Sequence, residues 1–261
     1  MKILETKDLC KIYGDDAGNE LHALKNVNIH ASKGEIVGIV GESGCGKSTF
    51  ANIIACITKS TSGKILFNNE DITHLNYKER RDYYKSFQMV FQSPLDTFSP
   101  KMKVERYMIE PSLNFKLMDK KSAKEYAKEL LATVGLSEGY MKKYPSELSG
   151  GELQRVVIAR AIGLKPELMI FDECTSALDV SIQQKIINLI IELQKEKGFT
   201  IMFITHNLVL AENICDRIYV MKSGEVVDVL NKGDFRNASH PYTKNLIDSI
   251  FTIEKLKEKA S

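Results

Sequence analysis

Apolar runs along the 261-residue chain predict buried strands that alternate with amphipathic helices. The runs are short, continuous and rich in branched side chains, as is typical of strands covered on both faces. The strands expected from them are 36–40, 89–91, 168–171, 200–205, 218–221 and 225–229. Helical spacing of apolar residues follows two of these runs, at Phe50, Ile53, Ile54 and Ile57 and at Ile182, Ile186, Ile190 and Leu193. The alternation predicts an α/β fold around a mainly parallel sheet.

Two regions depart from this alternation. Residues 1–34 contain short strands at 3–9 and 24–29 around a polar loop at 14–20, which predicts a small N-terminal antiparallel β-subdomain. The segment from about residue 93 to residue 165 begins with a proline-bounded loop and continues as helices. One helix is expected at 122–134, with a capping box from Ser122 to Glu125, and another at about 151–164. We therefore expect an inserted α-helical subdomain at about 93–165.

Composition excludes several classes of protein. Hydrophobic residues make up 43% of the chain, which suffices for a core, and the net charge of +2 gives no reason to expect nucleic acid. The charged N-terminus does not resemble a signal peptide, and no apolar run approaches the roughly 18 residues of a membrane span, so we expect a cytoplasmic location. Five scattered cysteines, without a C-x-x-C pair, predict reduced thiols.

Residues 41–49 fill every fixed position of the phosphate-binding pattern G-x-x-x-x-G-K-[ST]. The loop consists of Gly41, Glu42, Ser43, Gly44, Cys45, Gly46, Lys47, Ser48 and Thr49. Its glycines permit backbone N–H groups to turn inward around an anion, Lys47 adds a positive charge, and Ser48 has the hydroxyl needed to ligate Mg²⁺. A glycine-rich turn that binds nothing is the alternative. The preceding strand and following helix favour a nucleoside triphosphate.

Polar residues follow three of the expected strands. Asp172 and Glu173 come after 168–171, where Asp172 is suited to hold Mg²⁺ and Glu173 to orient or deprotonate the attacking water. His206 follows 200–205 and can hydrogen-bond a γ-phosphate or that water. Gln92 follows 89–91, within reach of a metal ion or a water. The alternatives are a helix cap for Asp172 and a solvated edge residue for Gln92. Together with the phosphate loop, the carboxylates predict hydrolysis.

Three further features each allow two interpretations. Tyr13 could offer its ring to adenine, or it could be a core tyrosine. Ser149, Gly150 and Gly151 open a helix whose N–H groups suit a second anion. Two copies facing each other would explain this site, and an ordinary serine cap is the alternative. The run 231–234 spells N-K-x-D, the guanine-recognition pattern of GTPases. However, Asp172 is not followed by the D-x-x-G of a GTPase switch, which argues against a GTPase.

In this order, the motifs resemble the ATP-binding cassette of ABC transporters over nearly the whole chain. The resemblance implies a P-loop NTPase core over residues 1–250, with a charged tail at 251–261. It also implies that Tyr13 stacks on adenine and that Gln92 senses the metal and couples to a permease. Ser149 to Gly151 would complete the site of a partner subunit, Glu173 would be the catalytic base, and His206 the switch histidine. ATP and Mg²⁺ are the implied ligands, with Ser48, Gln92 and Asp172 around the metal.

A finer resemblance is to the ATP-binding subunits of peptide and nickel importers. It rests on the segments 90–94, 99–100, 151–155, 176–183 and 240–243, the last reading His-Pro-Tyr-Thr. This resemblance implies a second cassette of the same or a paralogous kind, two transmembrane permeases, an extracytoplasmic binding protein and a peripheral location at the cytoplasmic membrane face. No cysteine follows Cys215, so we expect no iron–sulfur cluster, unlike in longer members.

Two departures and several rivals stay open. Glu152 replaces the commoner glutamine of the signature, and Cys174 stands where proline is frequent. An exporter's cassette is one alternative, because the permease sets the direction of transport, and the run 240–243 is the only feature that discriminates against it. A non-transport P-loop NTPase is the remaining enzyme class. A soluble ABC protein for DNA repair or translation would need a coiled coil or a second cassette, and a pure binding module would lack Glu173.

Overall fold

The computed structural model describes residues 1–14, 18–234 and 237–248, which divide into two compact units. The first unit comprises Met1–Leu75 and Thr200–Ser261, and the second is Asn76–Phe199. The expected helical insertion at about 93–165 falls within the second unit, and the expected tail at 251–261 lies outside the described residues. None of the described helices is both long enough and apolar enough to cross a bilayer.

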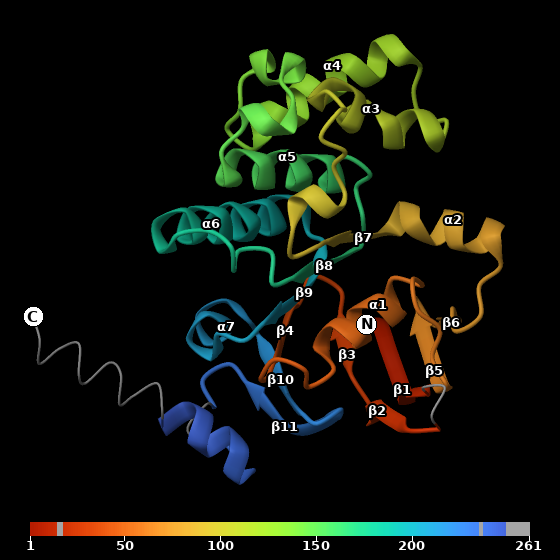
Figure 1. Ribbon diagram of the computed structural model, residues 1–261, viewed down its shortest axis with the longest axis vertical. Coiled ribbons are helices and arrows are strands. Elements are labelled where there is room, and N and C mark those ends of the chain that lie inside the picture. Colours follow the sequence, from red (N-terminus) through yellow and green to blue (C-terminus); the bar gives the residue numbers. More distant parts are fainter. Residues whose placement is uncertain (15–17, 235–236, 249–261) are drawn as a thin grey trace, which may run out of the picture. The chain divides into compact units, whose positions relative to one another are not determined.

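An antiparallel sheet forms the N-terminal part of the first unit (Figure 1). Its strands are β1 (Lys2–Gly14), β2 (Glu20–Val27), β3 (His30–Ser32), β5 (Ser62–Phe67) and β6 (Glu70–Asp71). They are ordered β2-β1-β5-β6, with β3 also paired to β1. The sheet was expected, but β1 continues to Gly14 rather than ending at Leu9. Register shifts between Leu9 and Ile12 bend β1, so that its second half pairs with β2.

The parallel strands of the first unit carry its core. β4 (Ile36–Val40) is buried along its whole length and pairs in parallel with β9 (Thr200–Thr205) and with β10 (Arg217–Lys222). The hairpin partner β11 (Glu225–Asn231) runs antiparallel to β10. Helices α1 (Lys47–Ile54) and α7 (Leu208–Ile214) follow β4 and β9, and residues 241–248 form another helix. Because β4, β9 and β10 are parallel, their carboxyl ends share one edge.

Strand direction excludes the guanine-recognition interpretation of residues 231–234. Asn231 ends β11 and pairs with Arg217, which begins β10 and pairs with Val37 near the start of β4. The phosphate loop instead follows Val40, at the end of β4. The N-K-x-D run therefore lies at the opposite edge of the sheet.

The second unit contains the parallel strands β7 (Phe87–Val90) and β8 (Leu168–Asp172) and most of the helices. Its helices are α2 (Tyr77–Ser86), α3 (Val104–Asn114), α4 (Lys120–Thr133), α5 (Gly150–Ile162) and α6 (Val180–Lys197). Its short 3-10 turns are η1 (Pro94–Asp96), η2 (Glu138–Lys142) and η3 (Pro145–Glu147). Helices α3, α4 and α5 pack against one another (Figure 1). Arg160 of α5 is tied to α3, because its Nε donates to the carbonyl of Tyr107 at 3.0 Å.

Helix α4 begins earlier than its capping pattern predicts. Its N-cap is Asp119 rather than Ser122, because the Asp119 carboxylate accepts a hydrogen bond from the Ser122 N–H at 2.9 Å. A carboxylate caps a helix at least as well as a hydroxyl, so the first acceptor in the sequence wins. The predicted Ser122–Glu125 capping box is therefore wrong.

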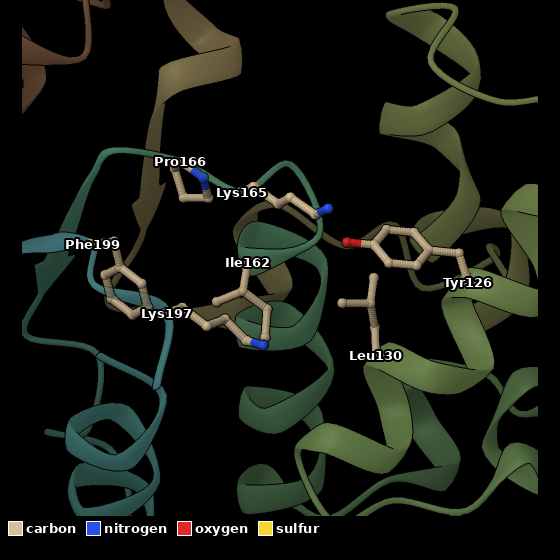
Figure 2. Close-up of a pocket in the computed structure, with 7 residues that line it drawn as sticks. All are labelled: Tyr126, Leu130, Ile162, Lys165, Pro166, Lys197 and Phe199. Carbon is tan, nitrogen blue, oxygen red and sulfur yellow. The ribbon is translucent and has the colours of Figure 1, made fainter. Parts of the chain in front are cut away.

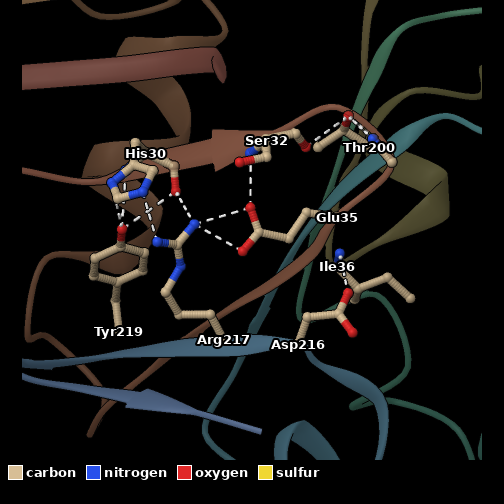
Figure 3. A network of polar contacts seen from close by, with 9 residues as sticks. His30, Ser32, Glu35, Ile36, Thr200, Asp216, Arg217 and Tyr219 are labelled. Carbon is tan, nitrogen blue, oxygen red and sulfur yellow. Dashed lines mark hydrogen bonds and ion pairs between the residues drawn. The ribbon is translucent and has the colours of Figure 1, made fainter. Parts of the chain in front are cut away.

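A polar network ties together the amino ends of β3, β4 and β10 (Figure 3). Arg217 donates from Nη2 to both carboxylate oxygens of Glu35, at 2.7 and 2.9 Å, and its Nη1 lies 2.6 Å from His30 Nε2. The Tyr219 hydroxyl lies 3.1 Å from His30 Nδ1. Burial and the adjacent Arg217 charge lower the pKa of His30, so its imidazole is neutral near pH 7. His30 is therefore a structural residue.

Replacing Glu35 by alanine is expected to destabilise the protein by about 3 kcal/mol, because a buried ion pair that loses one partner leaves an uncompensated charge. Only 16% of the Glu35 side chain and 15% of the Arg217 side chain are exposed. Urea unfolding measures the change. Glu125→Ala is the control, because its pair with Lys128 is exposed and contributes about 0.5 kcal/mol or less. If both variants lowered the free energy of unfolding equally, the Glu35–Arg217 pair would not be a buried, stabilising ion pair.

Candidate functional site

The phosphate loop follows β4 directly and leads into α1, as predicted from the sequence. Two of its glycines are required by close backbone contacts. A Cβ on Gly41 would lie 2.2 Å from the carbonyl oxygen of Met221. Gly46 has φ +108°, and its Cβ would lie 2.5 Å from the carbonyl oxygen of Ala23. The loop is therefore held against β2 and β10 in a conformation that only glycine adopts at these positions.

Lys47 is buried within the loop, with only 4% of the residue exposed. Its Nζ donates to the carbonyls of Gly41 at 2.8 Å and Glu42 at 2.9 Å, and it lies 3.7 Å from Cys45 Sγ. Burial raises the pKa of the Cys45 thiol, so the sulfur is uncharged. No side chain caps α1 at Gly46, and no acidic residue lies in its first turn. A buried ammonium beside the positive end of a helix favours an anion.

His206 lies at the same edge of the sheet as the loop. β4 pairs in parallel with β9, and Val40 is opposite Thr205, so the loop and His206 leave neighbouring strands at the same level. Tyr13 comes from β1 of the same unit and is 40% exposed, with Lys11 Nζ 4.5 Å from its ring centroid. The alternative of a buried core tyrosine is therefore wrong, and a solvent-facing ring remains available for stacking.

In the second unit, Gln92 and the two carboxylates share an edge. β7 pairs in parallel with β8, and Val90 is opposite Phe171, so Gln92 and Asp172 follow the ends of adjacent strands. The Gln92 Nε2 donates to the Ser176 hydroxyl at 3.4 Å, and that hydroxyl donates to the Glu173 carbonyl at 2.9 Å. The predicted strand at 89–91 is found at Phe87–Val90.

The backbone around the carboxylates is specialised. Asp172 is 7% exposed and ends β8, and the next helix, α6, is capped by Asp179, so Asp172 is not a helix cap. Glu173 has φ 45°, a left-handed conformation that is unusual for a residue with a Cβ and is common at functional sites. Cys174 is buried, which raises the pKa of its thiol to about 12. This cysteine is therefore a neutral, apolar packing residue.

Ser149 caps α5 in a reciprocal capping box with Glu152. The Glu152 carboxylate accepts from the Ser149 N–H at 2.8 Å and from its hydroxyl at 2.9 Å, while Ser149 Oγ accepts from the Glu152 N–H at 3.4 Å. The Tyr140 hydroxyl also donates to Glu152. This donor, followed by those of Ser149, lowers the pKa of Glu152 to about 2. Glu152 thus orders the helix start.

The glycines after Ser149 let the start of α5 approach Leu178 and the first turn of α6. A Cβ on Gly151 would lie 2.7 Å from Ile182 Cγ2, and one on Gly150 would lie 3.1 Å from Leu178 Cδ2. Ser149 is thus an ordinary helix cap in its local structure, as the alternative interpretation expects. It leaves the first N–H groups of α5 directed outward from the helix start, where a second anion would be expected.

A residue that the motif analysis did not assign to the site also contacts the phosphate loop. The Tyr242 hydroxyl accepts a hydrogen bond from the Glu42 N–H at 3.2 Å. The only sequence signal for Tyr242 is the run His-Pro-Tyr-Thr at 240–243. This run supports the resemblance to importer subunits and does not by itself point to the site.

A cavity of about 280 Å³ in the second unit contains none of the predicted site residues (Figure 2). It is lined by Tyr126, Leu130, Ile162, Lys165, Pro166, Lys197 and Phe199. The Tyr126 hydroxyl donates to the Gly163 carbonyl at 3.1 Å, so its polar end already has a partner within the unit. The described residues also contain no group of three His, Cys, Asp or Glu side chains arranged to hold a metal.

Comparisons with known proteins agree with this geometry. Residues 24–176 match the sequence profile of the family described as ABC transporter. The chain is 41% identical over 256 residues to the oligopeptide transport ATP-binding protein AppF of Bacillus subtilis (strain 168), covering 95% of this chain and 78% of that protein. It is 40% identical over 252 residues to the probable peptide ABC transporter ATP-binding protein y4tS of Sinorhizobium fredii (strain NBRC 101917 / NGR234), covering 94% and 71%.

Solved structures give the same picture. The dimeric post-hydrolysis state of the ATP-binding cassette MJ0796 bound to ADP and Pi superposes with a TM-score of 0.77 at 33% identity, covering 87% of this chain and 98% of that chain. CbiO1 from Clostridium perfringens, described as part of the ABC transporter complex cbiONQ, gives a TM-score of 0.79 at 30% identity, covering 98% and 94%.

The low pKa of Glu152 predicts an acid-sensitive contribution to stability. Hydrogen bonds from Tyr140 and Ser149 lower the pKa of this carboxyl from its ordinary value of 4.5 to about 2 in the folded protein. The contribution is fully present above pH 4.5 and is lost as the pH falls toward 2. The difference in unfolding free energy between the wild type and Glu152→Gln should therefore narrow over that range, as measured by denaturant unfolding at several pH values. Glu125→Gln, on a solvated face of α4, is the control. A difference in unfolding free energy that does not change with pH would contradict the prediction.

Proposed function

The chain belongs to the ABC transporter family as an ATP-hydrolysing cassette, and we propose that it powers peptide import through membrane-spanning partner subunits. Relatives named for oligopeptide and peptide transport support this substrate class over nickel complexes. The observation that carries the ATPase mechanism is the buried Lys47, held at the positive end of α1 inside a loop of required glycines.

The residues present fit ATP and Mg²⁺. Lys47 satisfies its ammonium with loop carbonyls, which phosphate oxygens can replace as stronger, charged acceptors. Ser48 in α1 offers a hydroxyl, Asp172 a carboxylate and Gln92 an amide oxygen, all oxygen donors of the kind Mg²⁺ prefers. Bound Mg²⁺ would neutralise negative charge on the β- and γ-phosphates.

Each remaining residue of the proposed site has one task. Tyr13 stacks its exposed ring on adenine, and the backbone N–H groups of the loop beyond Glu42, together with Lys47, bind the phosphates. Glu173 orients the attacking water and accepts its proton. His206 hydrogen-bonds the γ-phosphate or the water. The unusual backbone angle of Glu173 supports this assignment, because strained residues gather at reacting centres.

A second cassette completes the site in this proposal. The start of α5 at Ser149, Gly150 and Gly151 of one subunit covers the γ-phosphate held by the loop of the other. The capping box supports this role, because it fixes the helix start without help from a partner. The second cassette is an identical or a paralogous chain. ATP then joins the two subunits, and hydrolysis releases them.

Transport requires proteins beyond the cassettes. We place the chain at the cytoplasmic face of the membrane as a peripheral subunit of two permeases. The segment from Gln92 to Pro100 would transmit movement, because Gln92 contacts Ser176 beside the catalytic glutamate. An extracytoplasmic binding protein would deliver the peptide. An exporter's cassette is the second candidate, and the direction of transport distinguishes the two.

Glu173→Gln should bind ATP with near wild-type affinity and lower hydrolysis by roughly 10²- to 10⁴-fold, because the amide keeps the shape of the side chain but accepts no proton. The bound state should accumulate as an ATP-dependent dimer, measured by size-exclusion chromatography beside phosphate release. Glu212→Gln, an exposed carboxylate on α7, should leave both readouts unchanged. A Glu173→Gln protein that hydrolyses ATP at the normal rate would refute the assignment of the base.

The substrate class is tested with the complete transporter in vesicles that contain ATP on the cassette side. Peptide-loaded binding protein added to the opposite side should stimulate ATP hydrolysis, with labelled peptide accumulating on the cassette side. Nickel-loaded or empty binding protein should give no more than the basal rate. Movement of peptide away from the cassette side would indicate an exporter.

A further inference from the structure

The described part of the C-terminal segment, residues 237–248, contacts the phosphate loop through one side chain. Tyr242 is 8% exposed, and its hydroxyl accepts a hydrogen bond from the Glu42 N–H at 3.2 Å. These two residues are 200 positions apart in the sequence, so the contact depends on the fold. None of the tasks assigned above uses Tyr242.

The contact falls on a peptide group that Lys47 also holds. The Gly41 carbonyl and the Glu42 N–H belong to one planar unit. The carbonyl accepts from Lys47 Nζ at 2.8 Å, and the N–H donates to Tyr242. This peptide group is therefore hydrogen-bonded at both ends, to the Lys47 ammonium through its carbonyl and to the Tyr242 hydroxyl through its N–H.

In the proposed site, ATP binding changes the hydrogen bond from Lys47 but not the one to Tyr242. An ammonium has three N–H donors. The donors of Lys47 face the carbonyls of Gly41 and Glu42 and the sulfur of Cys45. Contact with phosphate oxygens must therefore replace one or more of these partners. The hydrogen bond from Glu42 to Tyr242 involves a different atom and does not compete with phosphate.

Tyr242 is itself fixed by the strands that support the loop. Asp228 of β11 accepts hydrogen bonds from the N–H groups of Ser239 at 3.0 Å and His240 at 3.1 Å. The Tyr242 N–H donates to His240 Nδ1 at 3.1 Å, and Lys222 Nζ lies 4.8 Å from the Tyr242 ring centroid. Burial raises the pKa of the Tyr242 hydroxyl, so it is neutral near pH 7. The phenol is thus held in place independently of the nucleotide.

We propose that Tyr242 is a positioning residue for ATP binding, whose hydroxyl keeps the Gly41–Glu42 peptide group in its phosphate-binding orientation after Lys47 turns to the phosphates. This inference rests on the proposed role of the loop as the ATP site. It gives the His-Pro-Tyr-Thr run a task within the cassette, since the run places the phenol and Asp228 anchors it.

The test is the variant Tyr242→Phe, which keeps the ring and removes only the acceptor. Removing the acceptor of the Glu42 N–H should raise the KM and the Kd for ATP about tenfold while kcat stays within about twofold, because the loop binds ground state and transition state alike. Hydrogen exchange at the Glu42 amide, followed by mass spectrometry, should become faster in the variant.

Tyr219→Phe is the matched control. Tyr219 is 2% exposed and loses comparable hydrogen bonds, but at the opposite edge of the same strands. It should lower the free energy of unfolding without changing the KM for ATP. If both variants raise KM equally, or if neither does, Tyr242 has a structural role only and the proposal is overturned.

Two further measurements keep the result interpretable. Lys47→Ala should abolish ATP binding, and if it binds ATP like the wild type, the assignment of the loop fails rather than that of Tyr242. If Tyr242→Phe does not fold, replacement of Tyr242 by 3-fluorotyrosine weakens the hydroxyl as an acceptor but retains it. That protein should show an intermediate KM, and an unchanged KM would overturn the proposal.

Discussion

The parallel pairing of β4 between β9 and β10 decides where the first unit can hold a phosphate. Because the three strands run in one direction, their carboxyl ends meet at one edge, and Val40 lies level with Thr205 and Val220. The glycine loop begins one residue beyond this level, and close contacts with Met221 and Ala23 keep it there. Every later property of the loop, including the burial of Lys47 and the direction of α1, depends on this register.

Burial of Lys47 makes the loop responsive to its ligand. A desolvated ammonium is unfavourable unless hydrogen-bond acceptors surround it, and here two backbone carbonyls supply them. These acceptors carry only partial charges, whereas a triphosphate offers full ones. The free loop therefore holds its lysine in a satisfied but replaceable arrangement. The opposite edge of the same strands is built differently, since Arg217 and Glu35 neutralise each other there.

The sequence predicts the elements that are strongly periodic or chemically specialised, such as the phosphate loop, β8, β9 and α6. It does not predict α2, because Tyr83 is the only residue of that helix that is buried, so no apolar face is visible. It also does not predict α3, which contains Pro111. The start of α4 is misplaced because Asp119 competes with Ser122. Long-range contacts such as Tyr242 with Glu42 leave no local pattern, and neither does the exposure of Tyr13, which depends on the pairing of β1.

In the proposed dimer, the start of α5 meets the second cassette, and its capping box bears on how the two chains join. Glu152, Ser149 and Tyr140 order the helix start within a single chain, so no segment there needs to fold during the encounter. An interface that is already formed loses little conformational entropy on association. The rate at which such surfaces join is then governed by diffusion and mutual orientation, and their lifetime by how quickly they separate.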